Sequence, residues 1–273
     1  MKPYGLYFIH FYFMFGLSIV DYNTANLTLK LLDQFQKNAA IRMAVTINGD
    51  DFTINDKDVI VLRSNNIGYA CGHNQNIAAL KNLGIHRVLI LNTDLRLSPN
   101  EVIGLFSSLD KRTAIVAPRV ILSDRNIVQG PYLRPSFFTE VTEEILILPY
   151  LWRKYRESRQ NYDNVFRVIG AVFVVDTAKI YPVFDEFTFL GSEEDILGER
   201  LLELGFKTKV DENTVVFHDH GVARRKFGLI RSELKFLNSR KYYFHRYRNI
   251  PKPITNLLYI KFICRIPILL LRG

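Results

Sequence analysis

The chain has 273 residues, of which 48% are hydrophobic, 13% aromatic and 23% charged, with 15 glycines and 10 prolines. This composition indicates one large or two small globular domains and excludes a disordered, collagen-like or low-complexity chain. The two cysteines exclude a disulfide framework and a cysteine-rich zinc site, and they suit a reducing cytosol.

An apolar run, Leu6–Val20, opens the chain. At 15 residues it is shorter than the roughly 20 that a membrane-spanning helix needs. No small-residue cleavage site follows it, so we expect no signal peptide. We predict an apolar extension over residues 1–16, a main domain over 17–230 and a basic amphipathic segment over 231–273.

Hydrophobic periodicity predicts alternating strands and helices through the main domain. The predicted strands are Leu17–Asp21, Met43–Ile47, Asp58–Leu62, Arg87–Leu91, Ala114–Val120, Val168–Val175 and Val215–Phe217. The predicted helices are Thr24–Asn38, Asn74–Leu83, Pro99–Leu109, Trp152–Tyr162 and Ile196–Leu204, with Gly205 as the C-cap of the last. This alternation indicates an α/β fold with a mainly parallel sheet.

The basic residues gather near the end of the chain. From Val222 to Gly273 there are 13 Lys or Arg and one acid, within a formal net charge of +9 for the whole chain. A nucleic-acid-binding protein more often spreads its basic groups over a folded face, so we expect no nucleic-acid partner. Lys261 and Arg265 interrupt the apolar run Ile254–Leu271, which makes crossing a bilayer costly. The segment therefore predicts either a helix in an anionic membrane interface or a helix docked on the body.

Polar clusters directly follow several of the apolar strands, where ligands of parallel α/β sheets bind. They are Asp21-Tyr22-Asn23, Asn48-Gly49-Asp50, Asn92-Thr93-Asp94, Glu193-Glu194-Asp195 and His218. We expect these clusters to lie together along the edge of the sheet where the strands end, which we call the rim. Asp94 suits a divalent cation bound with a diphosphate, although a turn would also explain it. The three acids suit either a general base or the first turn of a helix.

Two further features leave alternatives open. His218 is either a metal or phosphate ligand or a structural histidine. The segment from Asn66 through Gly68 to Asn74 is rich in turn formers, and its backbone N–H groups could meet a phosphate. It has neither the lysine of a P-loop nor the spacing of a dinucleotide fingerprint.

Taken in order, these segments resemble the family 2 glycosyltransferases of the GT-A fold, especially the rhamnosyltransferase-like branch. The matching segments are Ser18–Thr24, Asn65–Ile77, Leu91–Asp94, Gly170-Ala171 with Phe184–Leu190, Glu193-Glu194 with Arg200, and His218. Three positions depart from the family pattern. Ile47-Asn48 stands where an acid would contact the nucleobase, which leaves Asp50 and Asp51 as the candidate substitutes. Asn92 replaces the first acid of the metal motif, and Glu194 replaces the catalytic Asp.

The resemblance implies an inverting transfer of a sugar, such as rhamnose, from a dTDP- or UDP-sugar to a glycan or lipid-linked acceptor in bacterial cell-surface polysaccharide synthesis. Mg²⁺ or Mn²⁺ would be held by Asp94 and His218. Glu194 would be the base, with Glu193 and Asp195 as the alternatives. The implied nucleotide-binding residues are Tyr22, Asn23, Asn48, Asn66, Gly68, Asn74 and Asn92.

The resemblance also implies a cytoplasmic enzyme that associates peripherally with the inner face of the cell membrane, with a homodimer left open. Two other functions remain. A sugar-nucleotide nucleotidyltransferase would carry a basic, glycine-rich loop after its first strand, and Asp21–Asn26 contains no Lys or Arg. A catalytically degenerate binding protein would explain the missing acid at Ile47.

Overall fold

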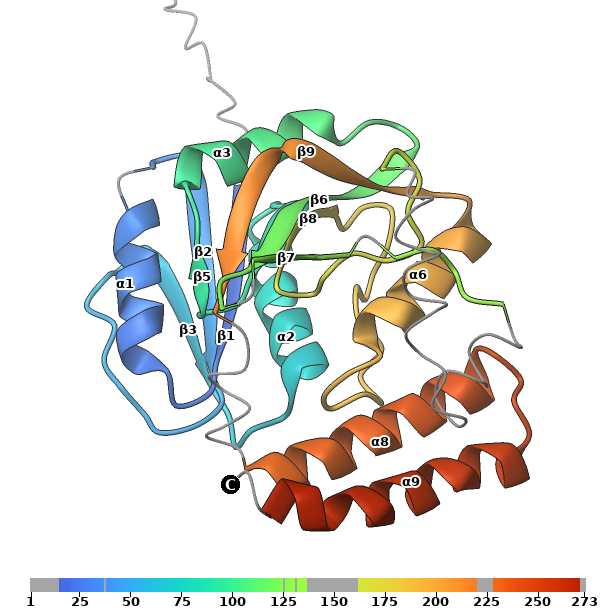
Figure 1. The fold of residues 1–273 in the computed structure, drawn as a ribbon. Coiled ribbons are helices and arrows are strands. Elements are labelled where there is room, and N and C mark those ends of the chain that lie inside the picture. Colours follow the sequence, from blue (N-terminus) through green and yellow to red (C-terminus); the bar gives the residue numbers. More distant parts are fainter. Residues whose placement is uncertain are drawn as a thin grey trace, which may run out of the picture.

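The computed structural model describes residues 15–36, 38–124, 126–130, 132–136, 162–219 and 228–270. A central sheet is covered by helices on both faces (Figure 1). Residues 1–14 of the predicted extension and 152–161 of the predicted polar helix lie outside the described residues. The predicted alternation of strands and helices around a mainly parallel sheet is confirmed.

The sheet has a parallel half and a mixed half. β1 (Phe15–Asp21), β2 (Ile41–Ile47), β3 (Val59–Arg63) and β4 (Arg87–Leu91) are parallel, in the order β3-β2-β1-β4. β8 (Val172–Asp176) runs antiparallel between β4 and β6 (Thr113–Leu122), and β9 (Lys207–His218) is parallel to β6. The short β5 (Leu95–Arg96) and β7 (Ile127–Gln129) pair with β9 and β6. The carboxyl ends of β1, β2, β4 and β9 and the start of β8 therefore share one edge.

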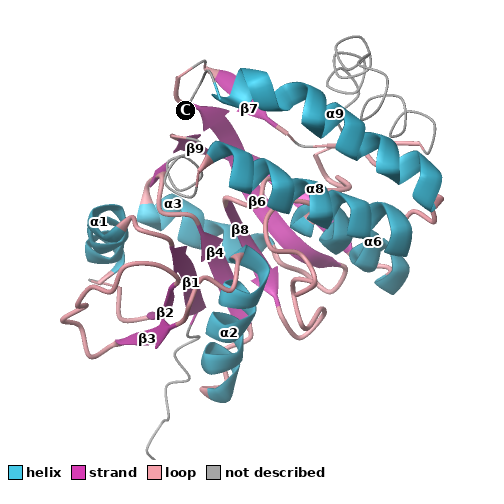
Figure 2. Ribbon diagram, turned by 90° about the horizontal axis from the view of Figure 1, so that it is seen from below, coloured by secondary structure: helices cyan, strands magenta, loops and turns pink. Residues whose placement is uncertain are grey.

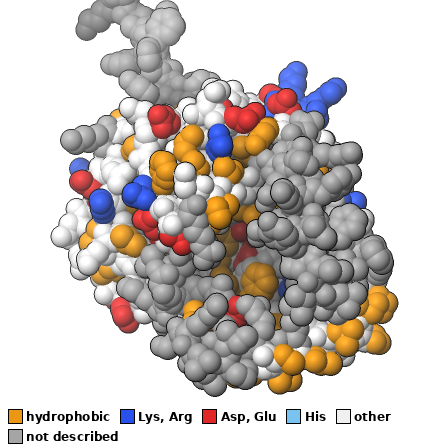
Figure 3. Space-filling view, in the orientation of Figure 1, with side chains coloured by type: hydrophobic (Ala, Val, Ile, Leu, Met, Phe, Trp, Pro, Cys, Tyr) orange, Lys and Arg blue, Asp and Glu red, His pale blue; other side chains and the backbone are white. Residues whose placement is uncertain are grey.

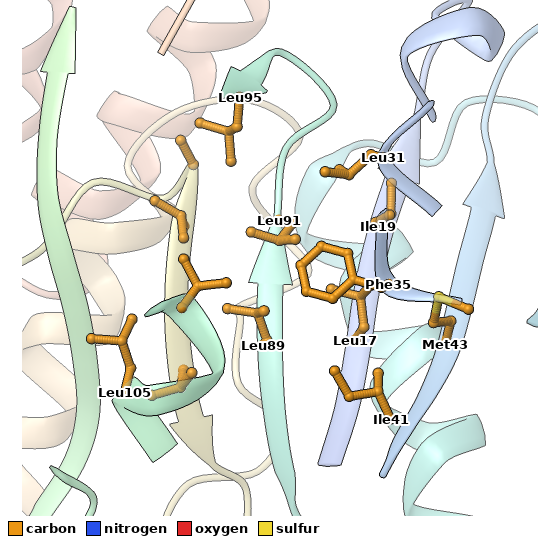
Figure 4. Close-up of a cluster of buried hydrophobic side chains, with 14 of the residues drawn as sticks. Leu17, Ile19, Leu31, Phe35, Ile41, Met43, Leu89, Leu91, Leu95 and Leu105 are labelled. Carbon is orange, nitrogen blue, oxygen red and sulfur yellow. The ribbon is translucent and has the colours of Figure 1, made fainter. Parts of the chain in front are cut away.

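Helices cover the two faces of this sheet separately. α1 (Ala25–Phe35) and α3 (Pro99–Gly104), with the 3₁₀ turn Leu105–Ser108, pack on one face, and α2 (Tyr69–Asn82) and α6 (Glu193–Leu204) pack on the other. Phe35 of α1 lies close to Leu17 of β1 and Leu91 of β4 in the first core (Figure 4). Burial of these side chains supplies most of the force that assembles the layers.

The last two helices form an antiparallel pair beside α6. α8 (Leu229–Arg246) lies between the body and α9 (Lys252–Leu270) (Figures 1 and 2). Ile196 of α6 packs with Tyr243 and Phe244 of α8 and with Leu258 of α9 in a third core. The pair is thus docked on the body, as one of the two alternatives predicted. Among the described residues, no helix combines the length and the apolarity that crossing a membrane requires.

Several element boundaries differ from the predictions. β1 begins at Phe15, inside the predicted extension, and β8 begins only at Val172. α2 begins at Tyr69 rather than Asn74, because polar residues that suggested a loop are buried in helix against the sheet. β9 begins at Lys207, since its polar first half pairs with β6 and shows little apolar alternation.

Candidate active site

The loop after β1 is fixed by a buried carboxylate. Asp21 accepts hydrogen bonds from the hydroxyl groups of Thr24 and Thr28, both at 2.6 Å, and from the Thr24 backbone N–H at 3.3 Å. Its side chain is fully buried and organises the loop. The Thr24 hydroxyl lies 3.0 Å from that of Thr93, which joins the end of β1 to the segment after β4.

The turn after β2 meets the loop after β1 through Asn23. Asn23 has a left-handed backbone (φ 56°), and its Oδ1 accepts the backbone N–H of Asp50 at 2.6 Å. A Cβ on Gly49 would lie 1.9 Å from that oxygen, so the glycine allows Asn23 to approach this closely. Tyr22 is half-buried beside Asn23. Two of the predicted rim clusters therefore lie in contact.

The two acids that could replace the missing nucleobase ligand are both exposed. Asp51 accepts a hydrogen bond from Arg63 Nε at 2.7 Å, which commits one of its oxygens to a surface ion pair. The carboxylate of Asp50 is exposed next to the backbone N–H that Asn23 holds. Ile47 itself is buried in the first core. Of the two acids, Asp50 is thus the one closer to the rim.

Three of the residues predicted to bind the nucleotide form hydrogen bonds within the protein that hold neighbouring loops together. Asn48 donates from Nδ2 to the Gly68 carbonyl at 3.1 Å and accepts the Ser64 hydroxyl at 2.5 Å. Asn66 accepts the Gly68 N–H at 3.4 Å. Asn74 exchanges two hydrogen bonds with the Phe184 backbone and also donates to Glu186. These side chains shape the rim, and their contact with a nucleotide stays a prediction.

The structure brings Asp94 and His218 together. Leu95 pairs with His218 across β5 and β9, which sets Asp94 Oδ1 3.3 Å from His218 Nε2. His218 Nδ1 lies 2.9 Å from Gln129 Oε1, which can only accept, so Nδ1 carries the proton. The Nε2 lone pair then faces the Asp94 carboxylate. Two such electron-rich groups repel each other unless a cation or a proton lies between them.

That donor set fits a divalent metal. A neutral imidazole oriented by a hydrogen bond on its other nitrogen, next to a carboxylate, is a common pair of metal ligands. In the part of the chain that the structure describes, no third His, Cys, Asp or Glu joins the pair. The remaining coordination positions would fall to a ligand and to water. Asn92, just before this pair, is half-buried and donates its backbone N–H to the Ala171 carbonyl at 2.8 Å.

The three acids occupy the first turn of α6 in three different states. Asp195 is held by Arg167 at 3.1 Å and by Arg240 at 2.6 Å, so it is a buried ion-pair partner. Glu193 is 3% exposed, and no described residue bonds its Oε1. Glu194 is partly exposed and accepts the Gly170 backbone N–H at 3.1 Å. Of the three, Glu194 has the geometry that an accessible base requires.

Burial controls the ionisation of these acids. It raises the pKa of Glu193 well above its usual range, and the nearby charge of Glu194 raises that pKa further. Glu193 therefore keeps its proton to a higher pH than an exposed glutamate would. The pKa of Glu194 is likewise raised by burial, with the Arg167 charge acting against the rise.

Two residues that the sequence did not single out as ligands complete the site. A Cβ on Gly170 would lie 2.1 Å from Glu194 Oε1, so only glycine allows this approach. Tyr69 donates its hydroxyl to the Gly170 carbonyl at 2.6 Å, and burial raises its pKa, so the hydroxyl stays protonated. Because Ala171 bonds Asn92 and Gly170 bonds Glu194, the metal pair and the acid lie on adjoining segments.

A cavity of about 540 Å³ lies at the opposite end of the sheet. It is lined in part by His86 before β4 and Thr177 after β8. Its cations are already engaged: Lys179 bonds Asp176, and Arg200 donates to the carbonyls of Pro182 and Val183. This cavity is separate from the rim.

Comparisons with known proteins identify the fold. No protein-family model and no curated protein sequence matches the chain. Among solved structures, it is similar to the mannosyltransferase PcManGT from Pyrobaculum calidifontis in complex with GDP-Man and Mn²⁺, with a TM-score of 0.54 and 12% identity. That match covers 92% of this chain and 70% of the other. A similar match, with a TM-score of 0.54 and 11% identity, is to GalNAc-T7 with UDP, GalNAc and Mn²⁺; it covers 91% of this chain and 54% of that one. The fold is therefore the GT-A fold.

Proposed function

We propose that this chain is a metal-dependent, inverting glycosyltransferase. It transfers a sugar from a nucleoside-diphosphate sugar to a hydroxyl of a glycan or lipid-linked acceptor. The observation that carries the proposal is the pairing of Asp94 with His218 just after Asn92, which bonds Ala171, while the Glu194 carboxylate bonds the adjoining Gly170. Within a GT-A fold, this arrangement provides a place for a cation and a separate place for a base.

Asp94 Oδ1 and His218 Nε2 would hold Mg²⁺ or Mn²⁺, and Gln129 would keep the imidazole in the required tautomer. Bound there, the cation would neutralise the charge that develops on the departing nucleoside diphosphate. The two similar solved structures each contain Mn²⁺ with a nucleotide or nucleotide sugar, which supports this assignment. The Asn23–Asp50 turn and Tyr22 would border the nucleotide.

Glu194 would accept the proton of the acceptor hydroxyl as the new bond to the anomeric carbon forms. The bond from that carbon to the diphosphate oxygen breaks in the same step, and its electron pair leaves with the nucleoside diphosphate. Attack opposite the leaving group inverts the anomeric configuration. The raised pKa of Glu194 suits a base that works near neutral pH. Asp195 is bound by two arginines, and Glu193 is buried with a pKa that burial raises well above its usual range, which favours Glu194 over both.

The C-terminal helices would place the enzyme at an anionic membrane surface. Leu257, Ile260 and Ile263 of α9 are 43%, 59% and 62% exposed, and hydrophobic side chains gather along the lower right edge of Figure 3. Exposed Lys252 and Arg246 lie on the same helix pair. Exposed apolar side chains and cations on one helix pair suit the head-group region of the inner leaflet, where a bacterial enzyme would meet a lipid-linked acceptor.

The proposed activity is tested by measuring nucleoside diphosphate release from a panel of dTDP-, UDP- and GDP-sugars, including dTDP-rhamnose. We expect release from one donor with Mn²⁺ or Mg²⁺, and its loss with a chelator or in Asp94→Asn. The matched control is Asp33→Asn, an exposed carboxylate on α1. Nucleoside diphosphate release that is unchanged both by the chelator and by Asp94→Asn would contradict the metal assignment. Pyrophosphate formation from a sugar phosphate and a nucleoside triphosphate would instead indicate a nucleotidyltransferase.

A further inference from the structure

Helix α8 reaches the acidic first turn of α6 through a buried arginine. Arg240 donates to Asp195 Oδ2 at 2.6 Å, and its side chain is 12% exposed. The guanidinium carbon of Arg240 also lies 4.7 Å from the ring centroid of Phe244, which fixes its position. On the other side of Asp195, Arg167 binds Oδ1 at 3.1 Å. Asp195 thus lies between two guanidinium groups, one from α8 and one from the segment before β8.

Arg167 is shared between Asp195 and the neighbouring Glu194. Its positive charge lowers the pKa of Glu194, against the burial that raises it, and the charge of Asp195 adds to the rise. Arg240 neutralises Asp195 from the far side. Without Arg240, the Asp195 charge would be less compensated and would draw Arg167 toward itself. Both changes would favour the protonated form of Glu194.

α8 also holds the loop that leads to these acids. Ser239 Oγ accepts the backbone N–H groups of Phe189 and Leu190 at 3.2 and 3.5 Å. Gly191 adopts a φ of +86°, and a Cβ there would lie 2.1 Å from the ring of Phe236. The loop is fixed from the opposite side as well, since the Phe189 carbonyl accepts the Tyr69 N–H at 3.1 Å.

The start of this loop is bound by the far end of the same helix. The hydroxyl groups of Tyr242 and Tyr247 donate to Asp185 Oδ2 at 2.9 and 2.6 Å. Phe187, which is 80% exposed, stacks on Tyr242 with the ring centroids 5.1 Å apart. Contacts from α8 and its C-terminal end therefore extend from Asp185 to Asp195, along the whole approach to Glu194.

We propose that α8 is a working part of the catalytic site, in which Arg240 acts through Asp195 and Arg167 as a positioning residue for Glu194. The groups that face Glu194 are the Gly170 N–H and Arg167 before β8, Glu193 and Asp195 on α6, and the Tyr69 hydroxyl on α2. Arg240 is the contribution of α8 to this set. The role of Glu194 as the base rests on the proposed function, whereas the charge coupling does not.

The coupling is tested by titrating Glu194 with ¹³C NMR on glutamate-labelled full-length protein, with the resonance assigned from Glu194→Gln. We expect Arg240→Gln to raise the titration midpoint by about one pH unit, within the range that a nearby opposite charge produces. Arg240→Lys should restore most of the original midpoint. Asp195→Asn should lower the midpoint, because it removes a like charge and frees Arg167 for Glu194. In the double variant, Arg240→Gln should have no further effect.

The matched control is Arg248→Gln. Arg248, just beyond the end of α8, is 8% exposed and binds Glu199 of the same helix α6 at 3.0 Å, so its loss tests general damage to the packing of the C-terminal segment against α6. We expect it to lower thermal stability without moving the Glu194 midpoint. Equal shifts in both variants, or a double variant that is simply additive, would overturn the proposal.

A second readout separates this inference from the proposed activity. In an active transferase, the acid limb of the pH profile of kcat/KM should move with the NMR midpoint in Arg240→Gln and return in Arg240→Lys. A moved midpoint without any sugar transfer would uphold the coupling and refute the activity. Transfer with an unmoved midpoint and an unmoved acid limb would refute the coupling alone.

Discussion

Carboxylates on or near the rim are set into different states by their immediate partners. Asp21 accepts hydrogen bonds from two hydroxyl groups and a backbone N–H, and Asp195 binds two arginines. Glu193 and Glu194 instead have pKa values raised mainly by burial. Some carboxylates therefore hold the structure together, while others are able to exchange a proton. The surroundings of each side chain, and not its residue type, decide between these two roles.

Gly170 should be essential for the orientation of Glu194. In Gly170→Ala, the new methyl group would displace Glu194 Oε1, which would lie 2.1 Å away. Since a misplacement of about 1 Å costs roughly 10²-fold, we expect kcat/KM to fall by that order. Gly104→Ala is the control, because a Cβ there meets nothing within 4 Å. Equal activity of the two variants would contradict this role of Gly170.

Glu193 should make stability decline as pH rises. Its folded-state pKa lies well above the unfolded value near 4.5, so its contribution is fully present below about pH 4.5 and is lost as pH rises through the folded pKa. Glu193→Gln removes this titration. We expect its melting temperature to exceed that of the wild type by more at pH 8 than at pH 5, as measured by calorimetry. A difference that does not change with pH would show that Glu193 does not titrate in the folded protein.

The sequence located the candidate residues better than it assigned their roles. It placed Asp94 and His218 on a common rim, and they lie 3.3 Å apart, because both directly follow apolar segments that end at one edge of the sheet. It did not find Arg240, which lies 45 positions after Asp195 in a segment that looks like a basic tail. Pattern and spacing report which elements form. They carry no signal for a single contact between distant segments.

Among the elements, the most regular were the easiest to predict. The strand Arg87–Leu91 is confirmed to the residue, because its last four residues are apolar and buried. α2 was harder to delimit, since its face toward the sheet is polar. The Ser18 hydroxyl and His73 Nδ1 share a hydrogen bond of 2.7 Å, and Asn76 donates to Ser18 and to the Ile19 carbonyl. Because buried polar side chains take the place of apolar ones on this face, the sequence lacks the apolar periodicity that would predict a helix.

The buried polar contact between α2 and β1, which includes His73, should make the protein sensitive to acid. Burial lowers the pKa of His73 to about 3, far below the unfolded value of 6.5. Its contribution to stability is thus present above pH 6.5 and is lost as pH falls toward 3. We expect His73→Gln to be less stable than the wild type at pH 7 but to lose less stability between pH 6.5 and pH 4. Denaturant titrations across this range measure it, and parallel curves would contradict it.

At the scale of the molecule, α8 and α9 connect the proposed catalytic site with the proposed membrane contact. In Figure 1 the arrowhead of β9, which ends at His218, points toward the end where these helices lie. One side of the pair holds the Asp185–Asp195 segment, and α9 exposes an apolar row. A lipid-linked acceptor would therefore be met on the same side as the site.

The apolar row on α9 should bind anionic vesicles. We expect Ile260→Glu/Ile263→Glu to lose co-sedimentation with phosphatidylglycerol vesicles and to retain its melting temperature, because both side chains are exposed. The matched control is Leu83→Glu, an equally apolar position that is 51% exposed beyond α2. Undiminished sedimentation of the double variant would refute this surface as the membrane contact.

Nucleoside diphosphate binding tests the central claim most directly, because it needs no acceptor. Calorimetric titrations with UDP, dTDP and GDP, each with Mn²⁺ or with chelator, should show metal-dependent binding of one nucleotide. Asp94→Asn should weaken that binding about tenfold or more. Asp33→Asn should bind as the wild type does. Absence of binding by every nucleotide, or equal binding by Asp94→Asn, would contradict a metal-dependent glycosyltransferase built on Asp94 and His218.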